Sequence, residues 1–514
     1  GHYTVNNGQY SQTYADVLVN INKRIQDFTI VANIGASYSG VTSKELGYAG
    51  PIRETGIPNL FNVYDLDNAK KRATQVGWRE ATESIFASAE VGWKSMLYLT
   101  VTGRNDWASQ LTHSPQASFF YPSVGLSAVI TEMLKLPDWV DYLKVRGSFS
   151  SVGNPYPRFL TYPTYSYDAN KQDWKSQTNY PIGKLYPERT DSWEVGLDAT
   201  LFKDFKLSGS FYYANTYNQT FYADLSLSSG YSNIPIQSGN IMNEGLEMSL
   251  GYNKQWKDFS FNTNYTLTWN KNRVKRLADG VYNYATGQPI QMPELSPLTY
   301  GHTDARLILR VGGSMGDVYG QRLLKRDLNG YILNEEGVGL AMENKETYLG
   351  SILPKMNMGW SLGFGYKGVN LGMTFTGRFG GIVISETQSV LDAAGVSKVS
   401  ADVRDAGGVQ INQSKVSAQT YYQTIQGTAA YYTYSATNVR LGELSLSYTL
   451  PKKWFDNKVG MTVGLVGKNL WMIYCKAPFD PELTTSAASN FYQGFDAYML
   501  PSTRNFGFNV KFQF

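Results

Sequence analysis

The acidic and histidine residues of this sequence do not form a recognisable catalytic or metal-binding set. The acid pairs Asp402 and Asp405, and Glu335 and Glu336, fall in predicted loops, where solvated charge is far commoner than a glycosidase pair. The segment Asp327–Gly330 resembles the start of a calcium loop but lacks the downstream ligands, so we expect a plain turn. The three histidines are scattered, and a single cysteine allows no internal disulfide and no cysteine-based metal site. We therefore expect no enzyme activity, no metal and no cofactor.

Length and composition narrow the fold class. The chain has 514 residues, which is too many for one soluble core and suits several domains or one large barrel. Charged residues make up only 17% and aromatic residues 14%, and the net charge of +4 is too small and too spread out to indicate nucleic-acid binding. The sequence contains no run of about 18 apolar residues, so it predicts no transmembrane helix, whereas a barrel strand needs only about 9–11 alternating residues.

The last segment, Ser502–Phe514, alternates between two faces. Side chains in a strand point to opposite faces in turn. One face holds Phe506, Phe508, Val510, Phe512 and Phe514, and the other holds Asn505, Gly507, Asn509, Lys511 and Gln513. Such a strand suits a barrel with lipid outside and water inside, and equally an amphipathic edge strand of a soluble sandwich. The ending is also similar to the terminal assembly signal of bacterial outer-membrane barrels, with Phe506, Phe508, Phe512 and Phe514 as the signal residues.

The same alternation predicts about seventeen strands along the chain. We expect them at about Ala15–Lys23, Phe28–Tyr38, Glu83–Trp93, Met96–Asp106, Phe119–Ile130, Leu143–Val152, Trp193–Leu201, Lys206–Phe221, Leu246–Tyr252, Phe259–Trp269, Thr303–Val311, Met315–Lys325, Asn357–Tyr366, Val369–Gly377, Asn438–Leu450, Val459–Tyr474 and Ser502–Phe514.

The connections between these strands alternate between short and long. The short ones are Arg24–Asp27, Lys94–Ser95, Thr131–Tyr142, Lys203–Phe205, Asn253–Lys257, Gly312–Ser314, Lys367–Gly368 and Pro451–Lys458. The long ones are Ser39–Gln75, Trp107–Ser118, Gly153–Pro187, Tyr222–Gly239, Asn272–His302, Arg326–Pro354, Phe379–Thr437 and Cys475–Leu500.

This pattern favours one fold class, an all-β transmembrane antiparallel barrel. Short turns at one end and long loops at the other are typical of outer-membrane barrels, whereas a sandwich mixes its loop lengths. We therefore expect a location in the cell outer membrane, with the long loops extracellular and the C-terminus periplasmic. Single-chain bacterial barrels have an even number of strands. An odd count, with no signal peptide at Gly1, leads us to expect that strands on the N-terminal side are absent from this chain.

Several segments resemble one family in the same order along the chain. Leu185–Leu197 (L-Y-P-E-R-T-D-S-W-E-V-G-L) is similar to the L-K-P-E-x-T-x-S-W-E-x-G-L segment of SusC-like (RagA-like) TonB-dependent transporters of the Bacteroidetes type. The segments Thr102–Trp107, Gly239–Glu247 and Ala436–Pro451, followed by the Asp480-Pro481-Glu482 triplet, resemble the same family. The resemblance covers about residues 72–514.

The resemblance implies an architecture and a function. It implies a 22-stranded barrel with an N-terminal plug, a TonB box that contacts the TonB–ExbB–ExbD complex, and a SusD-like surface lipoprotein as a lid. It also implies outer-membrane lipids and the barrel assembly machinery as partners, and energised import of oligosaccharides or, in some members, peptides. The plug, the TonB box and the first strands are missing here. Residues 1–514 are therefore expected to be the C-terminal part of such a barrel.

Candidate binding residues follow from these expectations. Sugar rings stack on aromatic faces while polar side chains bind the hydroxyls. The candidate loop aromatics are Tyr162, Tyr165, Tyr167, Trp174, Tyr421, Tyr422, Tyr431 and Tyr432, with Phe491, Tyr492, Phe495 and Tyr498 near the end. Each could instead pack loops together or meet a lid protein. On the polar side of their strands or at strand ends lie Arg104, Asp106, Glu194 and Asp198. They could contact the plug, the substrate or each other, and we expect them to face the lumen and contact the plug.

Two other functions remain open. A siderophore or cobalamin TonB-dependent receptor would more often carry basic or metal-complex contacts in its loops. An outer-membrane enzyme or adhesin is disfavoured because the sequence offers no Ser/His/acid set. The sequence does not name the substrate.

Overall fold

The structure is a computed structural model that describes residues 1–57, 59–162, 164–168, 173–180, 185–224, 230–277, 294–335, 339–411, 414–483, 485–486 and 490–514. It divides into two units. Unit 1 comprises residues 1–126, 148–191 and 224–237, and unit 2 comprises residues 127–147, 192–223 and 238–514. None of the helices among these residues is long and apolar enough to cross a membrane.

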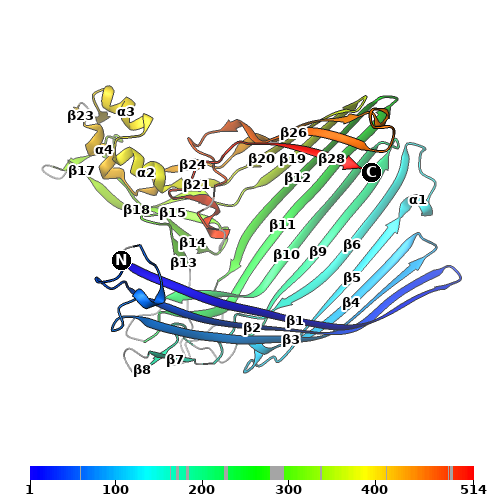
Figure 1. Ribbon diagram of the computed structural model, residues 1–514, viewed down its shortest axis with the longest axis horizontal. Helices are drawn as coiled ribbons and strands as arrows, with labels where there is room; N and C mark the ends of the chain where they lie inside the picture. Colours follow the sequence, from blue (N-terminus) through cyan, green and yellow to red (C-terminus); the bar gives the residue numbers. More distant parts are fainter. Residues whose placement is uncertain are drawn as a thin grey trace. The chain divides into compact units, whose positions relative to one another are not determined.

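Fifteen strands form one large sheet whose neighbours follow chain order. They are β1 (His2–Ile25), β2 (Phe28–Pro51), β3 (Arg72–Trp93), β4 (Leu97–Ala108), β5 (Phe119–Val129), β6 (Val140–Asn154), β9 (Glu188–Leu201), β10 (Phe205–Asp224), β11 (Asn233–Trp256), β12 (Phe259–Arg276), β19 (Met356–Tyr366), β20 (Val369–Phe379), β25 (Asn438–Leu450), β26 (Gly460–Cys475) and β28 (Asn505–Gln513). Within unit 2, the long strands β10, β11 and β12 run side by side in this sheet (Figure 1).

The up-and-down order is confirmed, and the alternation of connections is confirmed in part, because 109–118 and 225–232, expected to be long, are about as short as 130–139 and 451–459. Connections 26–27, 94–96, 202–204, 257–258 and 367–368 are short, whereas 52–71, 155–187, 277–355, 380–437 and 476–504 are long. Gln513 pairs with Gly460, the first residue of β26, so the end of β28 lies beside the short connection 451–459. The C-terminus is therefore at the end of the unit 2 strands that carries short connections (Figure 1).

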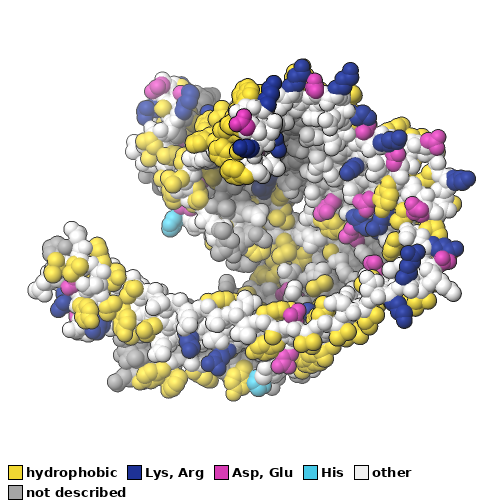
Figure 2. Space-filling model, turned by 45° about the vertical axis from the view of Figure 1, so that its right-hand side comes forward, with side chains coloured by type: hydrophobic (Ala, Val, Ile, Leu, Met, Phe, Trp, Pro, Cys, Tyr) yellow, Lys and Arg dark blue, Asp and Glu magenta, His cyan; other side chains and the backbone are white. Residues whose placement is uncertain are grey.

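Register places one apolar row across six strands of unit 2. The paired residues are Phe261, Phe364, Leu371, Leu446, Leu465 and Phe508. The row beside it on the opposite face is Asn262, Gly363, Gly372, Ser445, Val466 and Gly507, which is mostly polar or glycine. Leu446, Leu465 and Phe508 of this face are exposed, and Figure 2 shows hydrophobic side chains on the visible surface of the molecule. Such a face requires an apolar surrounding.

The first strands are longer than the sequence pattern predicted. β1 and β2 each have 24 residues, which at about 3.3 Å per residue is about 80 Å. The expected loop Ser39–Gln75 was therefore wrong at both ends, because β2 continues to Pro51 and β3 begins at Arg72, whereas 52–71 is a connection as expected. Apolar residues such as Val41 and Leu46 are sparse on this stretch and do not recur at every second position, so hydrophobic periodicity gave no signal. A strand this long extends well beyond the roughly 25 Å apolar band of an outer-membrane barrel.

Two of the expected barrel strands belong elsewhere, so the count of about seventeen was wrong. The segments expected as Thr303–Val311 and Met315–Lys325 are β14 (Arg306–Arg310) and β15 (Asp317–Leu324). They form a separate four-stranded sheet with β13 (Glu294–Thr299) and β18 (Met342–Ser351). The turn at 312–314 consequently lies in this small sheet, within one long connection between β12 and β19.

We call the body around this sheet the loop subdomain, residues 294–351, 382–435 and 495–496. Besides the four-stranded sheet, it contains β16 (Asn334–Glu335), β17 (Gly339–Leu340), β21 (Ile382–Ser385), β22 (Val409–Ile411), β23 (Ser414–Val416), β24 (Thr433–Ser435), β27 (Phe495–Asp496), α2 (Glu386–Ala393), α3 (Lys398–Asp405) and α4 (Ala418–Ile425). Figure 1 shows the three helices grouped together, and β27 pairs in parallel with β21.

Serine caps start all three helices of the loop subdomain. The side chains of Ser385, Ser397 and Ser417 each accept a hydrogen bond from the backbone N–H three residues ahead, which satisfies a donor that the first helical turn leaves free. The expected loop Phe379–Thr437 is therefore partly helical.

The remaining elements lie in connections. They are β7 (Tyr165–Asp168), β8 (Asp173–Ser176), α1 (Ile130–Met133) and the 3₁₀ turns η1 (Val63–Asp65), η2 (Ser109–Leu111), η4 (Ala429–Tyr431), η5 (Lys452–Phe455) and η6 (Asn490–Gly494).

Buried apolar clusters also form mainly in connections. One packs Tyr300, Leu307, Ile352 and Phe495, and a second packs Leu324, Tyr422 and Tyr432. The third, in unit 1, packs Leu111, Phe119, Tyr156, Leu160 and Leu185.

Candidate functional site

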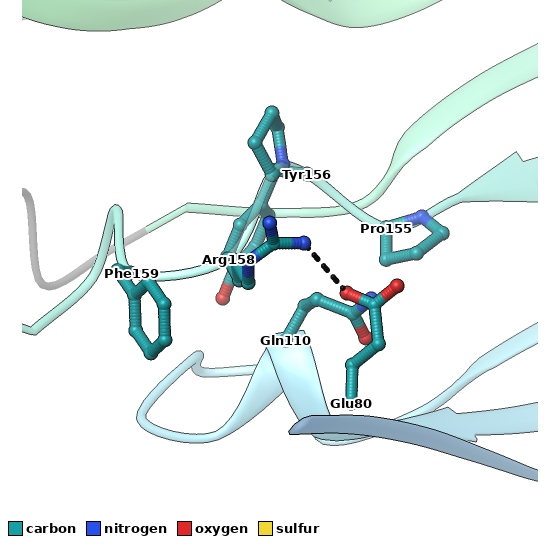
Figure 3. Close-up of a pocket in the computed structure, with 7 residues that line it drawn as sticks. Glu80, Gln110, Pro155, Tyr156, Arg158 and Phe159 are labelled. Atoms are coloured by element: carbon teal, nitrogen blue, oxygen red, sulfur yellow. Dashed lines mark hydrogen bonds and ion pairs between the residues drawn. The ribbon is translucent and has the colours of Figure 1, made fainter. Parts of the chain in front are cut away.

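A pocket of about 550 Å³ lies in unit 1, at the end of the strands that carries long connections. Its lining comes from three elements: Glu80 near the start of β3, Gln110 in η2 after β4, and residues 155–159 directly after β6 (Figure 3). The unit 1 apolar cluster around Tyr156 and Leu160 anchors the last segment. Ser114 also donates to the carbonyl of Leu185 at 2.6 Å, so η2 and the long connection are tied together.

An ion pair crosses the pocket. Arg158 Nη1 donates to Glu80 Oε2 at 3.2 Å, and Gln110 Nε2 donates to the same oxygen at 3.1 Å (Figure 3). The guanidinium carbon of Arg158 lies 3.6 Å from the ring centre of Trp78, two residues before Glu80 on the same face of β3. The side chains of Arg158 and Glu80 are 36% and 26% exposed to solvent, so a ligand can reach both.

Four candidate aromatics of the 155–187 connection are exposed, and their rings pair locally. Tyr162 stacks on His113 with ring centres 4.8 Å apart, and Tyr167 meets Trp174 edge-on at 5.3 Å across the β7–β8 hairpin. Tyr162, Tyr165, Tyr167 and Trp174 are between 53% and 63% exposed. The structure thus places these rings on one connection, together with the pocket segment 155–159.

The second candidate group packs inside the loop subdomain. Tyr422 and Tyr432 are 6% and 2% exposed, and Tyr421 and Tyr431 pack against the same cluster. Burial raises the pKa of Tyr432, and raises that of the neighbouring Tyr434 to about 12, so both stay neutral. Their ring faces are covered by protein in this structure, which matches the alternative that they hold loops together.

The aromatics near the end of the chain divide in the same way. Phe495 is buried in the core of the loop subdomain, and Phe491 and Tyr492 pack against it. Tyr498 is 60% exposed and donates to Glu386 Oε1 at 3.2 Å. Among these four, only Tyr498 offers an open ring.

Arg104 and Asp106 form a polar cluster on β4. Arg104 donates to Asp106 Oδ1 and to Ser84 Oγ, both at 2.7 Å, and the hydroxyl of Tyr121 donates to Asp106 Oδ2. The alternation of β4 sets these side chains on the face opposite Leu99 and Val101.

Glu194 and Asp198 share one arginine on the neighbouring strands of unit 2. Arg146 donates to Asp198 Oδ2 at 2.7 Å and to Glu194 Oε1 at 3.4 Å, while Ser208 donates to Asp198 Oδ1 at 2.6 Å. Both acids lie opposite the exposed Trp193 and Val195 on β9. Sequence reasoning named the acids but missed Arg146 and Ser208, whose partners lie on other strands.

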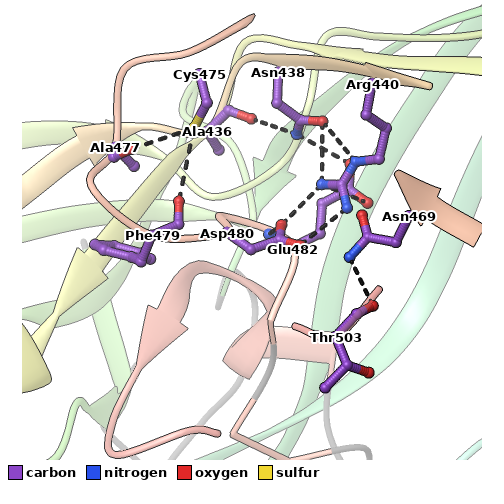
Figure 4. A network of polar contacts seen from close by, with 10 residues as sticks. All are labelled: Ala436, Asn438, Arg440, Asn469, Cys475, Ala477, Phe479, Asp480, Glu482 and Thr503. Carbon is purple, nitrogen blue, oxygen red and sulfur yellow. Dashed lines mark hydrogen bonds and ion pairs between the residues drawn. The ribbon is translucent and has the colours of Figure 1, made fainter. Parts of the chain in front are cut away.

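A buried ion pair joins the connection 476–504 to the start of β25. Arg440 makes a two-pronged contact with Asp480, Nη2 to Oδ1 at 2.8 Å and Nη1 to Oδ2 at 3.0 Å (Figure 4). Their side chains are only 11% and 9% exposed. Asn438, fully buried, accepts from Arg440 at 3.2 Å and donates to Glu482 Oε1 at 3.0 Å.

The ionisation of Asp480 reflects this environment. Burial opposes its charged form, but hydrogen bonds from Arg440 and from the backbone N–H of Glu482, with the positive charge of Arg440, outweigh burial and lower its pKa. The carboxylate therefore remains charged at neutral pH. The sequence contained these residues only as matches to family segments, and gave no signal that they meet.

These features together define a β-sheet protein of the outer-membrane barrel class: an up-and-down sheet with an exposed apolar face, a polar face and long connections gathered at one end. The β-barrel family model "TonB dependent receptor-like, beta-barrel" matches residues 1–470. The chain therefore belongs to this outer-membrane receptor family, and the expected class is confirmed.

Relatives and solved structures agree with this assignment. The chain is 24% identical to TonB-dependent receptor P3 of Formosa agariphila over 93% of its own length and 50% of that receptor. It is also 24% identical to TonB-dependent receptor P26 of the same organism, over 89% and 48%. The chain thus spans about half the length of these relatives.

Its fold is similar to the RagAB peptide importer in the open-open state, with a TM-score of 0.71, 18% identity and coverage of 99% of this chain and 55% of that one. The closed-closed state of the same importer gives a TM-score of 0.72 at 17% identity. The expected family is therefore confirmed as TonB-dependent receptor, and the expected likeness to RagA-like transporters is confirmed for the fold.

Proposed function

We propose that this chain is the C-terminal part of an outer-membrane transporter that imports oligosaccharides in a TonB-dependent manner. The observation that carries the proposal is the set of exposed rings Tyr162, Tyr165, Tyr167 and Trp174, on the same 155–187 connection as the pocket segment 155–159 with its Glu80–Arg158 pair. Flat aromatic faces next to hydrogen-bonding groups suit sugar rings. Family membership supplies the transport class.

The remaining parts of the proposal concern the rest of the protein. Residues 1–514 supply barrel strands and loops. A plug and a TonB box on the N-terminal side would couple to TonB–ExbB–ExbD, and a SusD-like lipoprotein would cover the long connections. These connections would be extracellular and the C-terminus periplasmic. The clusters around Arg104 and Arg146 would then face the lumen and contact the plug. The phenylalanines of β28 would be read by the barrel assembly machinery.

A second cargo class, peptides, is favoured by one observation. The similar solved transporter RagAB is described as a peptide importer. At 18% identity this similarity concerns the fold, so it makes peptide an outcome to test.

The test is mass spectrometry on the complete transporter extracted in detergent, together with uptake of labelled oligosaccharides by cells with and without its gene. We expect a co-purifying lipoprotein, a bound oligosaccharide, and uptake that stops when a protonophore removes the energy supply. A bound peptide would keep the importer and change its cargo. Uptake of iron chelates, or a barrel without lid or plug, would refute the proposal.

A further inference from the structure

The unit 1 pocket has a charge pattern that selects among ligands. Its seven lining residues include one acid, Glu80, and one base, Arg158, which are paired, so the pocket is neutral overall. An anionic or cationic ligand would therefore meet as much repulsion as attraction there, and would also have to break the ion pair to be bound. A neutral ligand meets neither cost.

The ion pair leaves donors and acceptors unused side by side. Arg158 uses only Nη1 and Glu80 only Oε2 in their mutual contact. Within the part of the chain that the structure describes, Arg158 Nη2 and Glu80 Oε1 make no further hydrogen bond. Gln110 Oε1 and the hydroxyl of Tyr156 are buried and also have no partner among those residues. These last two atoms are covered by protein, so the groups that a ligand can reach are Arg158 Nη2 and Glu80 Oε1, on side chains that are 36% and 26% exposed.

An exposed aromatic ring completes the pocket. Phe159 lines it, is 50% exposed, and has a backbone φ of +66°, in the left-handed region that non-glycine residues rarely adopt. Strain of this kind persists where the surroundings fix it, and is frequent at ligand sites. Figure 3 shows the Phe159 ring on the side of the pocket opposite Glu80, with Arg158 between them.

We propose that this pocket binds one ring of a neutral sugar, with Glu80 and Arg158 reading two adjacent hydroxyls and Phe159 covering an apolar C–H face. A hydroxyl both donates and accepts, so adjacent hydroxyls match the neighbouring free carboxylate oxygen and guanidinium N–H groups. An apolar ring face stacks on Phe159. This inference rests on the proposed function and deepens it, because it specifies an uncharged saccharide and the residues that select it.

The test uses the complete transporter, with its lid if one co-purifies, in lipid nanodiscs. Isothermal titration calorimetry would measure binding of neutral hexasaccharides of glucose, mannose and xylose, an anionic hexagalacturonate, and a neutral hexa-alanine peptide. We expect at least one neutral hexasaccharide to bind, and Phe159→Ala to weaken it at least about tenfold, which corresponds to about 1.4 kcal/mol. Phe159→Trp should retain binding, since it keeps the aromatic face.

Charge provides a second, independent readout. Glu80→Gln keeps the shape of the side chain but leaves Arg158 unneutralised, so we expect weaker binding of the neutral sugar and stronger binding of hexagalacturonate. The matched control is Phe61→Ala, a phenylalanine of the same unit that is 60% exposed and outside the pocket. Its binding should equal that of the unchanged protein.

The outcomes separate this inference from the proposed function. If neither Phe159→Ala nor Glu80→Gln changed the affinity for the neutral sugar, the assignment of this pocket would be overturned, whereas the proposed import function would be unaffected. Binding of hexa-alanine that depends on Phe159, without sugar binding at millimolar concentration, would overturn the saccharide. Oligosaccharide uptake that is the same in cells with and without the gene, or that continues with a protonophore present, would instead refute the proposed function.

Discussion

Replacing Asp480 by asparagine should loosen the connection 476–504 by a measurable and predictable amount. The Arg440–Asp480 pair is buried and two-pronged. Removing one member of a buried pair costs about 3–5 kcal/mol, because the other charge is left without its partner. Glu482, 3.4 Å from Arg440 Nη2, remains as partial compensation. We therefore expect about 3 kcal/mol, which is about a hundredfold in a local opening equilibrium.

Hydrogen exchange read by mass spectrometry would measure this opening. Peptides covering 476–483 and the first residues of β25 should exchange about a hundredfold faster in Asp480→Asn, whereas peptides in β10–β12 should not change. The matched control is Asp402→Asn, which removes an acid whose partner Lys398 is 86% exposed, and should have no effect on these peptides. A double change, Arg440→Met with Asp480→Leu, should recover much of the protection.

The same pair gives a pH dependence whose sign follows from the lowered pKa of Asp480. The pKa of Asp480 is lower in the folded protein than the ordinary value of about 3.9 for an aspartate in an unfolded chain. Such an acid stabilises the folded state, and this stabilisation is fully present when the pH is well above about 3.9. The contribution is lost as the pH falls through the folded pKa. Protection of 476–483 should thus be constant near neutrality and fall in acid, and this acid dependence should vanish in Asp480→Asn. If peptides covering 476–483 in Asp480→Asn exchanged at pH 7 within threefold of their rate in the unchanged protein, the reasoning would be refuted.

Three further predictions concern the apolar face, a buried hydroxyl and the last residue. Leu446→Arg should cost about 2–4 kcal/mol in lipid, whereas Ser445→Arg on the polar face should cost far less, as measured by equilibrium folding into vesicles. Tyr432→Phe should stabilise the loop subdomain by about 1 kcal/mol, seen as slower hydrogen exchange, because the buried hydroxyl has no partner among the described residues; destabilisation would show an undetected partner. Phe514→Ala should lower the fraction of heat-modifiable, assembled barrel, and Gln513→Ala should not.

The sheet was predictable from the sequence where strands alternate apolar and polar residues. Phe508 and Leu465 lie in segments whose two-residue period shows the face directly, and the short connections between such strands set the up-and-down order. Prediction failed where that period is weak. In the continuation of β2 to Pro51 the few apolar residues, such as Val41 and Leu46, do not recur at every second position, so the sequence predicts a loop there.

Contacts between distant segments explain the other errors. β14 and β15 have ordinary strand patterns, and only their pairing with β13 and β18 shows that they leave the main sheet. The Glu80–Arg158 pair joins residues 78 positions apart, and Ser385 meets Asp496 across 111 positions. No local period reports such contacts. The serines that cap α2, α3 and α4 are a local signal for the start of a helix, but the prediction used hydrophobic periodicity alone.

The parallel pairing of β27 with β21 has a consequence for biogenesis. Phe495 follows in the chain every other buried member of the cluster that it completes, and β28 is the next strand along the chain. During vectorial export, the loop subdomain must therefore wait with an open apolar core until the segment beside the final strand arrives. Exposed apolar surface makes such intermediates prone to aggregation. The apolar core of the loop subdomain is therefore completed only by a segment that lies next to β28 in the chain.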